Sequence, residues 1–296
     1  MIVFIHIGNQ SYFKASLAQA RSSNPCSLIY LIGNSFSSPS RLFLTKYKIN
    51  FISIDKFRSA REEFCNYYAH QGLNPVHYEL FCFQRWFILR DFLLSFKGPV
   101  QGVMLDSDAL LHTDIKNILS MMTTNMSVCD KSGPQFTFFK NVDVILDYTD
   151  FIINCYKLNS YKKKCEEYIK LNIHRGIPHM SDMVTLGLYA KSQKLFDTAK
   201  LSNSIVFDDN IAYSEIFFKG IFGKKIFKNN GEIFFKIIKS KKLIKVGGIH
   251  LQGESKRLWP IYVHKNLLID LLDFKSVLAF IFMYFNVIRL YFNKNG

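Results

Sequence analysis

Short apolar runs alternate with stretches of helical periodicity through the first third of the chain. The runs Ile2–Ile7, Ser27–Ile32 and Phe51–Ile54 predict buried strands, and the stretches near Tyr12–Arg21 and Ser59–His70 predict helices. Repeated strand–loop–helix units of this kind indicate an α/β fold, with a mainly parallel sheet flanked by helices. Ligands bind such sheets at the carboxyl ends of the strands, so the residues that follow each strand are the first candidates for function.

The next two elements lead to an acidic strand end. Tyr78–Phe96 predicts a long, mostly apolar helix, and Val100–Leu105 predicts a strand that runs directly into Asp106-Ser107-Asp108. Beyond it, residues 109–200 predict mixed helices and one polar loop at residues 174–182. The acidic triplet is therefore expected at the carboxyl end of a buried strand.

The end of the chain differs in kind. Leu267–Tyr291 is almost continuously apolar, but its uninterrupted part, Ser276–Phe285, is shorter than the ~20 residues that span a bilayer. A helix in the plane of a membrane, with Arg289 and Lys294 facing lipid headgroups, fits this pattern. A helix packed on the core fits it equally well, and the sequence leaves both open.

Composition adds a strong positive charge. The 296 residues include 38 Lys and Arg against 23 Asp and Glu, a formal net charge of +15, and the 49% of hydrophobic residues excludes a disordered chain. Nine lysines and one glutamate fall in residues 219–245. A basic, Phe-rich chain has three kinds of partner: nucleic acid, an anionic membrane face or phosphorylated substrates. The lysine-rich stretch is either a membrane-facing surface or an ordinary solvated one.

The six cysteines and the first residues predict a cytoplasmic protein. No two cysteines are spaced as CxxC, and none has zinc-finger spacing to a histidine, which is typical of a reducing compartment without disulfides. The opening stretch lacks the basic start of a secretion signal and reaches Gly8-Asn9 too soon for the apolar core of one.

The triplet Asp106-Ser107-Asp108 is the strongest local signal for chemistry. Two carboxylates one residue apart, just past a buried strand, can chelate a hard divalent cation, and such a cation neutralises a diphosphate. The alternative is a helix N-cap formed by Asp108 or Asp114. A phosphatase-type aspartyl nucleophile is disfavoured, because it belongs on the first strand and Leu110 stands where it needs Thr or Val.

A second signal lies in residues 248–256, GIHLQGESK. The imidazole of His250 is a good ligand for manganese, and Gly253 lets the backbone approach a phosphate closely. Lys256 supplies a positive charge for phosphate oxygens. Taken alone, this segment fits an ordinary surface turn with a solvated lysine equally well.

A DxD after a strand in the first half of the chain, combined with HxxGxxK near the end, resembles the glycosyltransferases of family 8. The resemblance implies the GT-A fold and a nucleotide-sugar donor. It also implies a divalent cation, Mn²⁺ or Mg²⁺, held by Asp106, Asp108 and His250, with Gly253 and Lys256 completing the motif. It covers about residues 1–260 loosely, and Trp259-Pro260 departs from the family's Pro-Trp ending. We therefore divide the chain into a GT-A catalytic domain, residues 1–262, and a membrane-associating or packing helix, residues 263–296.

The same resemblance implies roles at three further places. Ile7-Gly8-Asn9 resembles the first loop of bacterial surface-polysaccharide glycosyltransferases, which receives the donor's base, although the acidic residue typical of family 8 is missing there. Arg85 resembles the helix arginine that contacts the donor's phosphate or sugar.

Arg90 is the rival of Arg85 by spacing, and either arginine also fits a pair with Glu79 or Asp91 along the helix. Asp182 resembles the aspartate that binds the hydroxyls of the donor sugar. An N-cap for the helix that follows is the alternative reading of Asp182.

These features predict a metal-dependent glycosyltransferase that moves a sugar, from a UDP-sugar above all, to a saccharide or lipid-linked acceptor in bacterial surface polysaccharide synthesis. The resemblance implies that the anomeric configuration is retained. Peripheral contact with the inner face of the cytoplasmic membrane is expected, and nucleic acid is not an expected partner, because the sequence carries no RNA-binding aromatic motif, zinc knuckle or helix-turn-helix pattern.

Two alternatives remain. One is a non-catalytic basic protein that binds a membrane surface or nucleic acid. The other is a nucleotidyltransferase, which usually carries a Gly-rich triphosphate loop near its first strand, and Gly8-Asn9-Gln10 is not such a loop.

Overall fold

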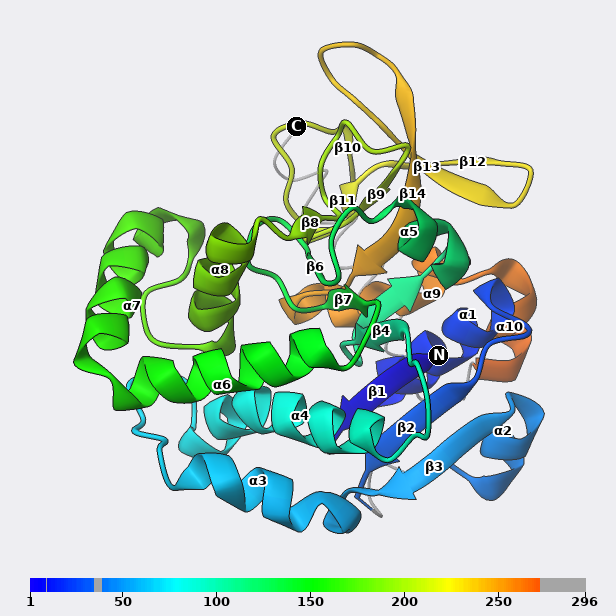
Figure 1. The fold of residues 1–296 in the computed structure, drawn as a ribbon. Coiled ribbons are helices and arrows are strands. Elements are labelled where there is room, and N and C mark those ends of the chain that lie inside the picture. The colour runs from blue at the N-terminus through cyan, green and yellow to red at the C-terminus, as the bar shows by residue number, and fades with distance from the viewer. Residues whose placement is uncertain (9, 35–38, 272–296) are drawn as a thin grey trace.

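A five-stranded sheet forms the centre of the computed structural model, which describes residues 1–8, 10–34 and 39–271 (Figure 1). The strand order is β3-β2-β1-β4-β7. The first three pairings are parallel, whereas β7 runs antiparallel to β4. The strands are β1 (Ile2–His6), β2 (Ile29–Gly33), β3 (Ile49–Ser53), β4 (Gly102–Leu105) and β7 (Phe136–Phe139).

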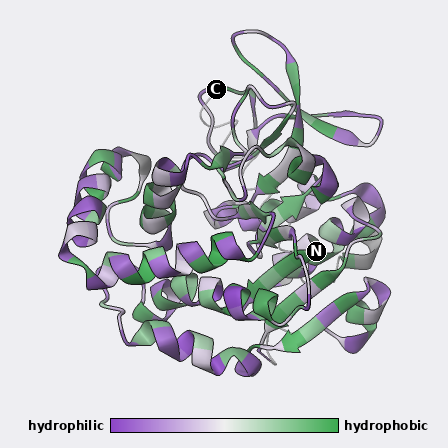
Figure 2. Ribbon diagram, in the orientation of Figure 1, coloured by the Kyte–Doolittle hydropathy of each residue, from purple (hydrophilic) through white to green (hydrophobic). Residues whose placement is uncertain are grey.

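Helices cover both faces of this sheet, which explains why its central strands are apolar throughout. Every residue of β1 is buried. Val3 and Ile5 pack on one side, in the same core as α4 and α6, and Ile2 and Phe4 pack on the other side with α1 and α5. Successive side chains of a strand point to opposite faces, so a strand covered on both faces reads as a continuous apolar run. Figure 2 shows the resulting hydrophobic centre and the mixed colouring of the surrounding helices.

The helices are mostly short and follow the strands in sequence. They are α1 (Ser11–Ser23), α2 (Arg41–Lys46), α3 (Arg58–Cys65), α4 (Val76–Leu94), α5 (Ile115–Met121), α6 (Asp143–Lys157), α7 (Asn159–Asn172), α8 (Asp182–Gln193), α9 (Trp259–Tyr262) and α10 (Lys265–Leu271). The described residues also form the 3₁₀ helices η1 (Ile54–Phe57), η2 (Ile173–Arg175) and η3 (Gly253–Leu258).

A second sheet brings the end of the chain back to the acidic strand end. Its order is β12-β13-β14-β5, and β9 also pairs with β14. Its strands are β5 (Ala109–Leu111), β9 (Ile205–Phe207), β12 (Ile226–Asn229), β13 (Glu232–Lys236) and β14 (Leu243–His250). Two small pairs complete the strands: β6 (Ser127–Val128) with β8 (Phe196–Asp197), and β10 (Lys219–Gly220) with β11 (Gly223–Lys224). Because β14 and β5 are antiparallel with His250 opposite Ala109, the last residue of β14 lies beside the acidic triplet.

The predicted α/β fold, with a mainly parallel sheet flanked by helices, is confirmed. The boundaries of the helices and strands differ from the predicted ones by a few residues. The largest difference is α3, predicted over Ser59–His70, which ends at Cys65. The second sheet was not predicted. Its strands β5 and β9 have only 3 residues each, and β12 and β13 mix apolar with charged or polar residues.

The predicted C-terminal helix is described only at its beginning. Val263 and Leu267 are buried in the core, and α10 packs against α1. The predicted apolar segment Ser276–Phe285, with Arg289 and Lys294, lies outside the described residues. Within the part of the chain that the structure describes, no helix is both long and apolar enough to cross a bilayer.

Candidate active site

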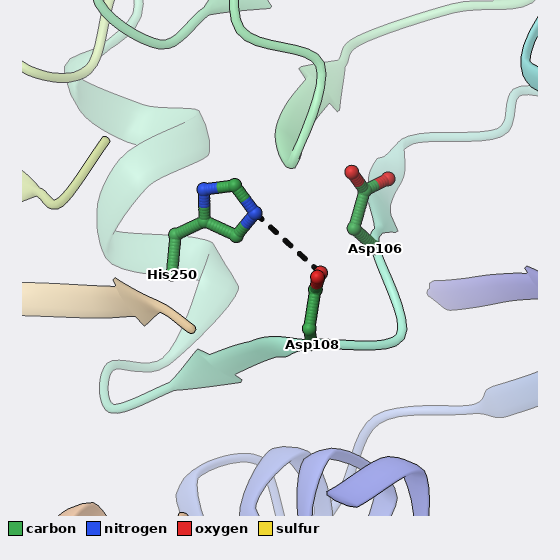
Figure 3. A group of neighbouring side chains, drawn as sticks. All are labelled: Asp106, Asp108 and His250. Atoms are coloured by element: carbon green, nitrogen blue, oxygen red, sulfur yellow. Dashed lines mark ion pairs between the residues drawn. The ribbon is translucent and has the colours of Figure 1, made fainter. Parts of the chain in front are cut away.

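A tight turn between β4 and β5 positions the acidic triplet. The backbone N–H of Asp106 donates to the carbonyl of Gln135 (3.2 Å), and the N–H of Ala109 donates back to the carbonyl of Asp106 (3.1 Å). The turn leaves the Asp106 and Asp108 side chains on the side that faces the ring of His250 (Figure 3). Asp114, by contrast, caps α5 by accepting from the N–H of Lys116 (2.9 Å). The capping role therefore falls to Asp114, and Asp108 faces His250.

His250 joins the carboxylates from the far end of the sequence. Besides the β14–β5 pairing, the N–H of Leu251 donates to the carbonyl of Asp108 (2.9 Å), which ties the two motifs together. Nε2 of His250 lies 3.5 Å from Oδ1 of Asp108 (Figure 3). One ligand atom from each of Asp106, Asp108 and His250 lies within 4.8 Å of the others.

A backbone carbonyl fixes the orientation of the His250 ring. Nδ1 lies 2.6 Å from the carbonyl oxygen of Asp209, which can only accept, so we assign the proton to Nδ1. Nε2 then faces Asp108. Burial opposes a charged imidazole, but the negative charge of Asp108 outweighs it and raises the pKa of His250 to about 9. Burial likewise disfavours a charged Asp108, yet His250 and Lys256 hold the pKa of that carboxyl below its usual value.

These donors fit a divalent cation. When the imidazole is neutral, the Nε2 lone pair and the carboxylate of Asp108 are two acceptors that face each other and repel. A proton or a metal ion between them removes this repulsion. A metal-binding histidine usually donates its other nitrogen to a carbonyl or carboxylate, as His250 does to Asp209. Two carboxylates with one imidazole suit Mn²⁺ and, less well, Mg²⁺.

Lys256 brings a positive charge to the same place. Gly253 has φ +59, a left-handed conformation suited to glycine, and begins η3, on which Lys256 lies. Nζ of Lys256 is 3.0 Å from Oδ2 of Asp108 and 5.2 Å from the centroid of the Tyr12 ring. The HxxGxxK segment thus delivers both its imidazole and its ammonium group to Asp108.

Arg85 links the triplet to α8. Its Nη1 pairs with Asp106, and its Nη2 lies 2.8 Å from Oδ2 of Asp182. Burial raises the pKa of Asp182, against the effect of Arg85. The rival Arg90 pairs instead with Glu63 and Asp91. Of the two arginines, only Arg85 lies at the acidic triplet.

The first loop is described in part. Ile7 is 37% exposed, Gly8 has φ +120, and Asn9 lies outside the described residues. Ser107 takes part through its backbone, because its carbonyl accepts from Oγ of Ser16 on α1 (2.7 Å). Whether this loop receives a base stays a prediction.

Three groups near the site were missed in the sequence. The first is His6, the last residue of β1. Burial lowers its pKa, and it interacts electrostatically with Asp108, Lys256 and Asp106. Tyr12 lies beneath Lys256, and burial raises its pKa. The third is the ion pair of Lys224 with Asp208, described below. The position of His6 at a strand end could have identified it, whereas nothing in the sequence marks Lys224, which lies in a lysine-rich stretch.

No protein-family model matches the chain, and no curated protein matches it in sequence. Among solved structures, the chain is similar to the galactosyltransferase LgtC in complex with donor and acceptor sugar analogues (13% identity, 71% of this chain and 75% of that chain, TM-score 0.40). It is also similar to an active-site mutant of LgtC (12%, 94% and 93%, 0.45) and to mouse xyloside xylosyltransferase 1 (10%, 71% and 86%, 0.43). All three are glycosyltransferases, the class that the sequence resemblance predicted. Identities and scores this low establish no family, so the functional proposal rests on the residues of this chain's own site.

Proposed function

We propose that this chain is a metal-dependent glycosyltransferase of the GT-A type. It would move a sugar from a nucleotide-sugar, preferably a UDP-sugar, to a saccharide or lipid-linked acceptor in bacterial surface polysaccharide synthesis. One observation carries the proposal: Asp106, Asp108 and His250, from distant parts of the chain, place their ligand atoms within 4.8 Å of one another at a strand end. Parallel α/β sheets bind nucleotides at this edge.

The proposed cation would be held by Asp106, Asp108 and His250, with manganese favoured by the imidazole. Bound there, it would supply Lewis-acid stabilisation of a diphosphate. The remaining chemistry belongs to the protein's own side chains. The partial burial of all three ligands reduces the competition of water with a bound anion.

Lys256 is the group proposed to stabilise the leaving nucleoside diphosphate. Its side chain is 33% exposed and its ammonium contacts Asp108, so it borders both solvent and the proposed cation site. Placed charge of this kind is usually the largest catalytic effect, and removal of one such group costs roughly 10²–10³ in rate.

Asp182 and Arg85 are proposed to hold the donor sugar. Asp182 is nearly buried beside Arg85, which keeps its carboxylate in one place relative to Asp106. A fixed carboxylate accepts hydrogen bonds from sugar hydroxyls, and such bonds strengthen as an oxocarbenium-like transition state forms. Retention of the anomeric configuration is proposed from the resemblance to family 8.

Peripheral contact with an anionic membrane is part of the same proposal. Residues 219–245, here called the lysine arm, run from β10 into β14, and the hairpins β12–β13 and β13–β14 within them project from the fold (Figure 1). Ile221, Ile238 and Leu243 on this arm are 49%, 38% and 51% exposed. Its exposed lysines are Lys219, Lys225, Lys228, Lys239, Lys241 and Lys242. Exposed lysines beside exposed aliphatic side chains are typical of a surface that contacts anionic lipid headgroups.

A donor screen tests the function. UDP-, GDP- and CMP-sugars are incubated with the protein and Mn²⁺, and release of the nucleoside diphosphate or monophosphate is measured. We expect Mn²⁺-dependent hydrolysis of a UDP-sugar, lost in Lys256→Met and kept in the matched variant Lys225→Met, whose lysine is exposed on the arm. Full turnover in excess chelator would reject the metal-dependent enzyme. Salt-sensitive oligonucleotide binding without hydrolysis would favour the non-catalytic alternative.

A further inference from the structure

A buried ion pair lies on the Nδ1 side of the His250 ring. Lys224, on β11, pairs with Asp208, and their side chains are only 4% and 0% exposed. The same ammonium lies 2.9 Å from Oδ1 of Asp209. Burial of both charges is costly, and a buried ion pair is often no more stabilising than apolar side chains of the same size. The pair therefore calls for an explanation other than stability.

The two aspartates that Lys224 holds are the residues that hold His250. Oδ2 of Asp208 accepts from the backbone N–H of His250 (3.3 Å), and the carbonyl of Asp209 accepts from Nδ1 of its ring (2.6 Å). The N–H of Asp208 also donates to the carbonyl of Gly248 (3.0 Å). Residues 208–209 thus fix both the backbone and the ring of the histidine.

The local backbone is shaped to bring Lys224 inward. Gly223 has φ +117, and a Cβ there would lie 2.2 Å from the carbonyl oxygen of Ile211, so only glycine allows this close approach. Lys224 then donates its N–H to that carbonyl (2.8 Å), and Ile211 donates its own N–H to the carbonyl of His250 (3.2 Å). Nζ of Lys224 lies 5.6 and 5.8 Å from the ring centroids of Phe217 and Phe235, both of which are buried.

We propose that Lys224 and Asp208 are positioning residues for His250. They hold the carbonyl of Asp209 against Nδ1, which keeps the proton on that nitrogen and leaves Nε2 to the cation. This inference rests on the proposed metal site. Outer partners of a metal ligand typically change metal affinity by about 10–100-fold when they are removed.

Mn²⁺ affinity is the first test, measured by electron paramagnetic resonance of free Mn²⁺ on the full chain. Lys224→Met is expected to weaken Mn²⁺ binding about 10–100-fold. The matched control is Lys245→Met, which breaks the ion pair with Glu232 on the sheet that carries His250, where the two side chains are 26% and 48% exposed. The control is expected to bind Mn²⁺ like the unmodified protein. Equal affinities for Lys224→Met and Lys245→Met would overturn the inference.

A second variant separates positioning from stability. Lys224→Met leaves a buried, unpaired carboxylate, whereas Lys224→Met combined with Asp208→Asn removes both charges and retains an acceptor for the N–H of His250. We expect the double variant to regain most of the lost stability and to remain weak in Mn²⁺ binding. Recovery of both properties together would mean that the pair serves only stability.

The ring nitrogens of His250 give a readout that needs no metal. In ¹⁵N-histidine NMR spectra of the metal-free protein, recorded above about pH 9 so that the His250 ring is neutral, Lys224→Met is expected to lower the population protonated at Nδ1, with His70 as an internal reference. An unchanged His250 signal would overturn the inference even if Mn²⁺ binding changed. If the unmodified protein bound no Mn²⁺ at all, the proposed function would fall, while the NMR result would still decide whether Lys224 positions the ring.

Discussion

Arg85 on α4 and Asp182 at the first position of α8 form an ion pair, with 2.8 Å between Nη2 and Oδ2. Their side chains are 12% and 7% exposed. The other arm of the same guanidinium pairs with Asp106. One arginine therefore compensates two carboxylates in a place that water reaches poorly.

Loss of this arginine is expected to destabilise the fold. Arg85→Met leaves Asp106 and Asp182 without their counter-charge, so the free energy of unfolding should fall by about 3–5 kcal/mol. Arg90→Met is the matched control on the same helix. Its partners Glu63 and Asp91 are 38% and 31% exposed and can be hydrated, so the loss should be about 1 kcal/mol. Urea unfolding at pH 7 measures the free energy of unfolding of both variants. Equal losses would contradict the explanation that burial makes the Arg85 pairs the more costly to break.

Metal binding should stabilise the protein through Asp108. At a Mn²⁺ concentration of about 100 times Kd, the folded state gains roughly 2.7 kcal/mol, which raises Tm by on the order of 5 °C. Asp108→Asn is expected to abolish this shift. Asp114→Asn should keep it, because Asn also caps a helix and Asp114 lies outside the cluster. Differential scanning fluorimetry with and without chelator measures the shift, and a shift that survives Asp108→Asn would place the cation elsewhere.

His112 makes stability depend on pH. Burial, with the charges of His264 and Lys228, lowers the pKa of His112 to about 3. Its Nδ1 lies 3.3 Å from Nε2 of Gln19, and its buried Nε2 has no hydrogen-bond partner among the described residues. Above pH 6.5 the histidine is neutral in both the folded and the unfolded chain. As the pH falls from about 6.5 to about 3, only the unfolded chain takes up this proton, so the unfolding free energy falls.

The expected contribution of His112 is up to about 1.4 kcal/mol per pH unit within that window. His112→Asn keeps an acceptor for Gln19 and does not titrate, so its unfolding free energy should vary less between pH 6.5 and 4 than that of the unmodified protein. The control is His70→Asn, at an exposed position. Urea unfolding across this range decides the matter, and parallel pH profiles for the two variants would refute the assignment to His112.

The lysines of the lysine arm should contribute more to binding of anionic vesicles than exposed lysines elsewhere in the chain. Replacement of Lys239, Lys241 and Lys242 by Gln removes about 1 kcal/mol of attraction each, or on the order of 100-fold in partition. The matched control replaces Lys162, Lys163 and Lys164, three exposed lysines on α7, and removes the same net charge. Sedimentation with phosphatidylserine vesicles compares them. Equal losses would mean that net charge alone acts, and no loss in the arm variant would exclude the arm.

The two motifs at the site could be predicted from the sequence, because their metal-binding residues stand at the ends of apolar runs that predict strands. Asp106 and Asp108 follow a continuous apolar run, and His250, Gly253 and Lys256 keep a recognisable spacing. The sequence could not decide between Arg85 and Arg90, since both lie on α4. Their distinguishing partners lie elsewhere in the fold: Asp106 and Asp182 for Arg85, and Glu63 for Arg90. Residues on one helix cannot show by spacing which of them meets another part of the fold.

Lys224 shows a different limit of the sequence. It lies among nine lysines in residues 219–245, and such a stretch is usually a solvated surface. Its burial depends on Gly223, which brings the backbone against Ile211, and on the acidic residues at 208–209. The strands of the second sheet were hidden for a related reason. In β12, for example, no residue is fully buried, so the alternation of apolar and polar residues that marks a strand is weak.

The pairing of β5 with β14 also orders events during synthesis. The ribosome delivers Asp106 and Asp108 long before His250, and β5 has no neighbour on that edge until β14 emerges. Such distant pairing forms late, because the intervening chain must first be closed into a loop. A chain that ends short of residue 250 would carry two carboxylates, an open strand edge and no imidazole, so it would lack the proposed cation site altogether.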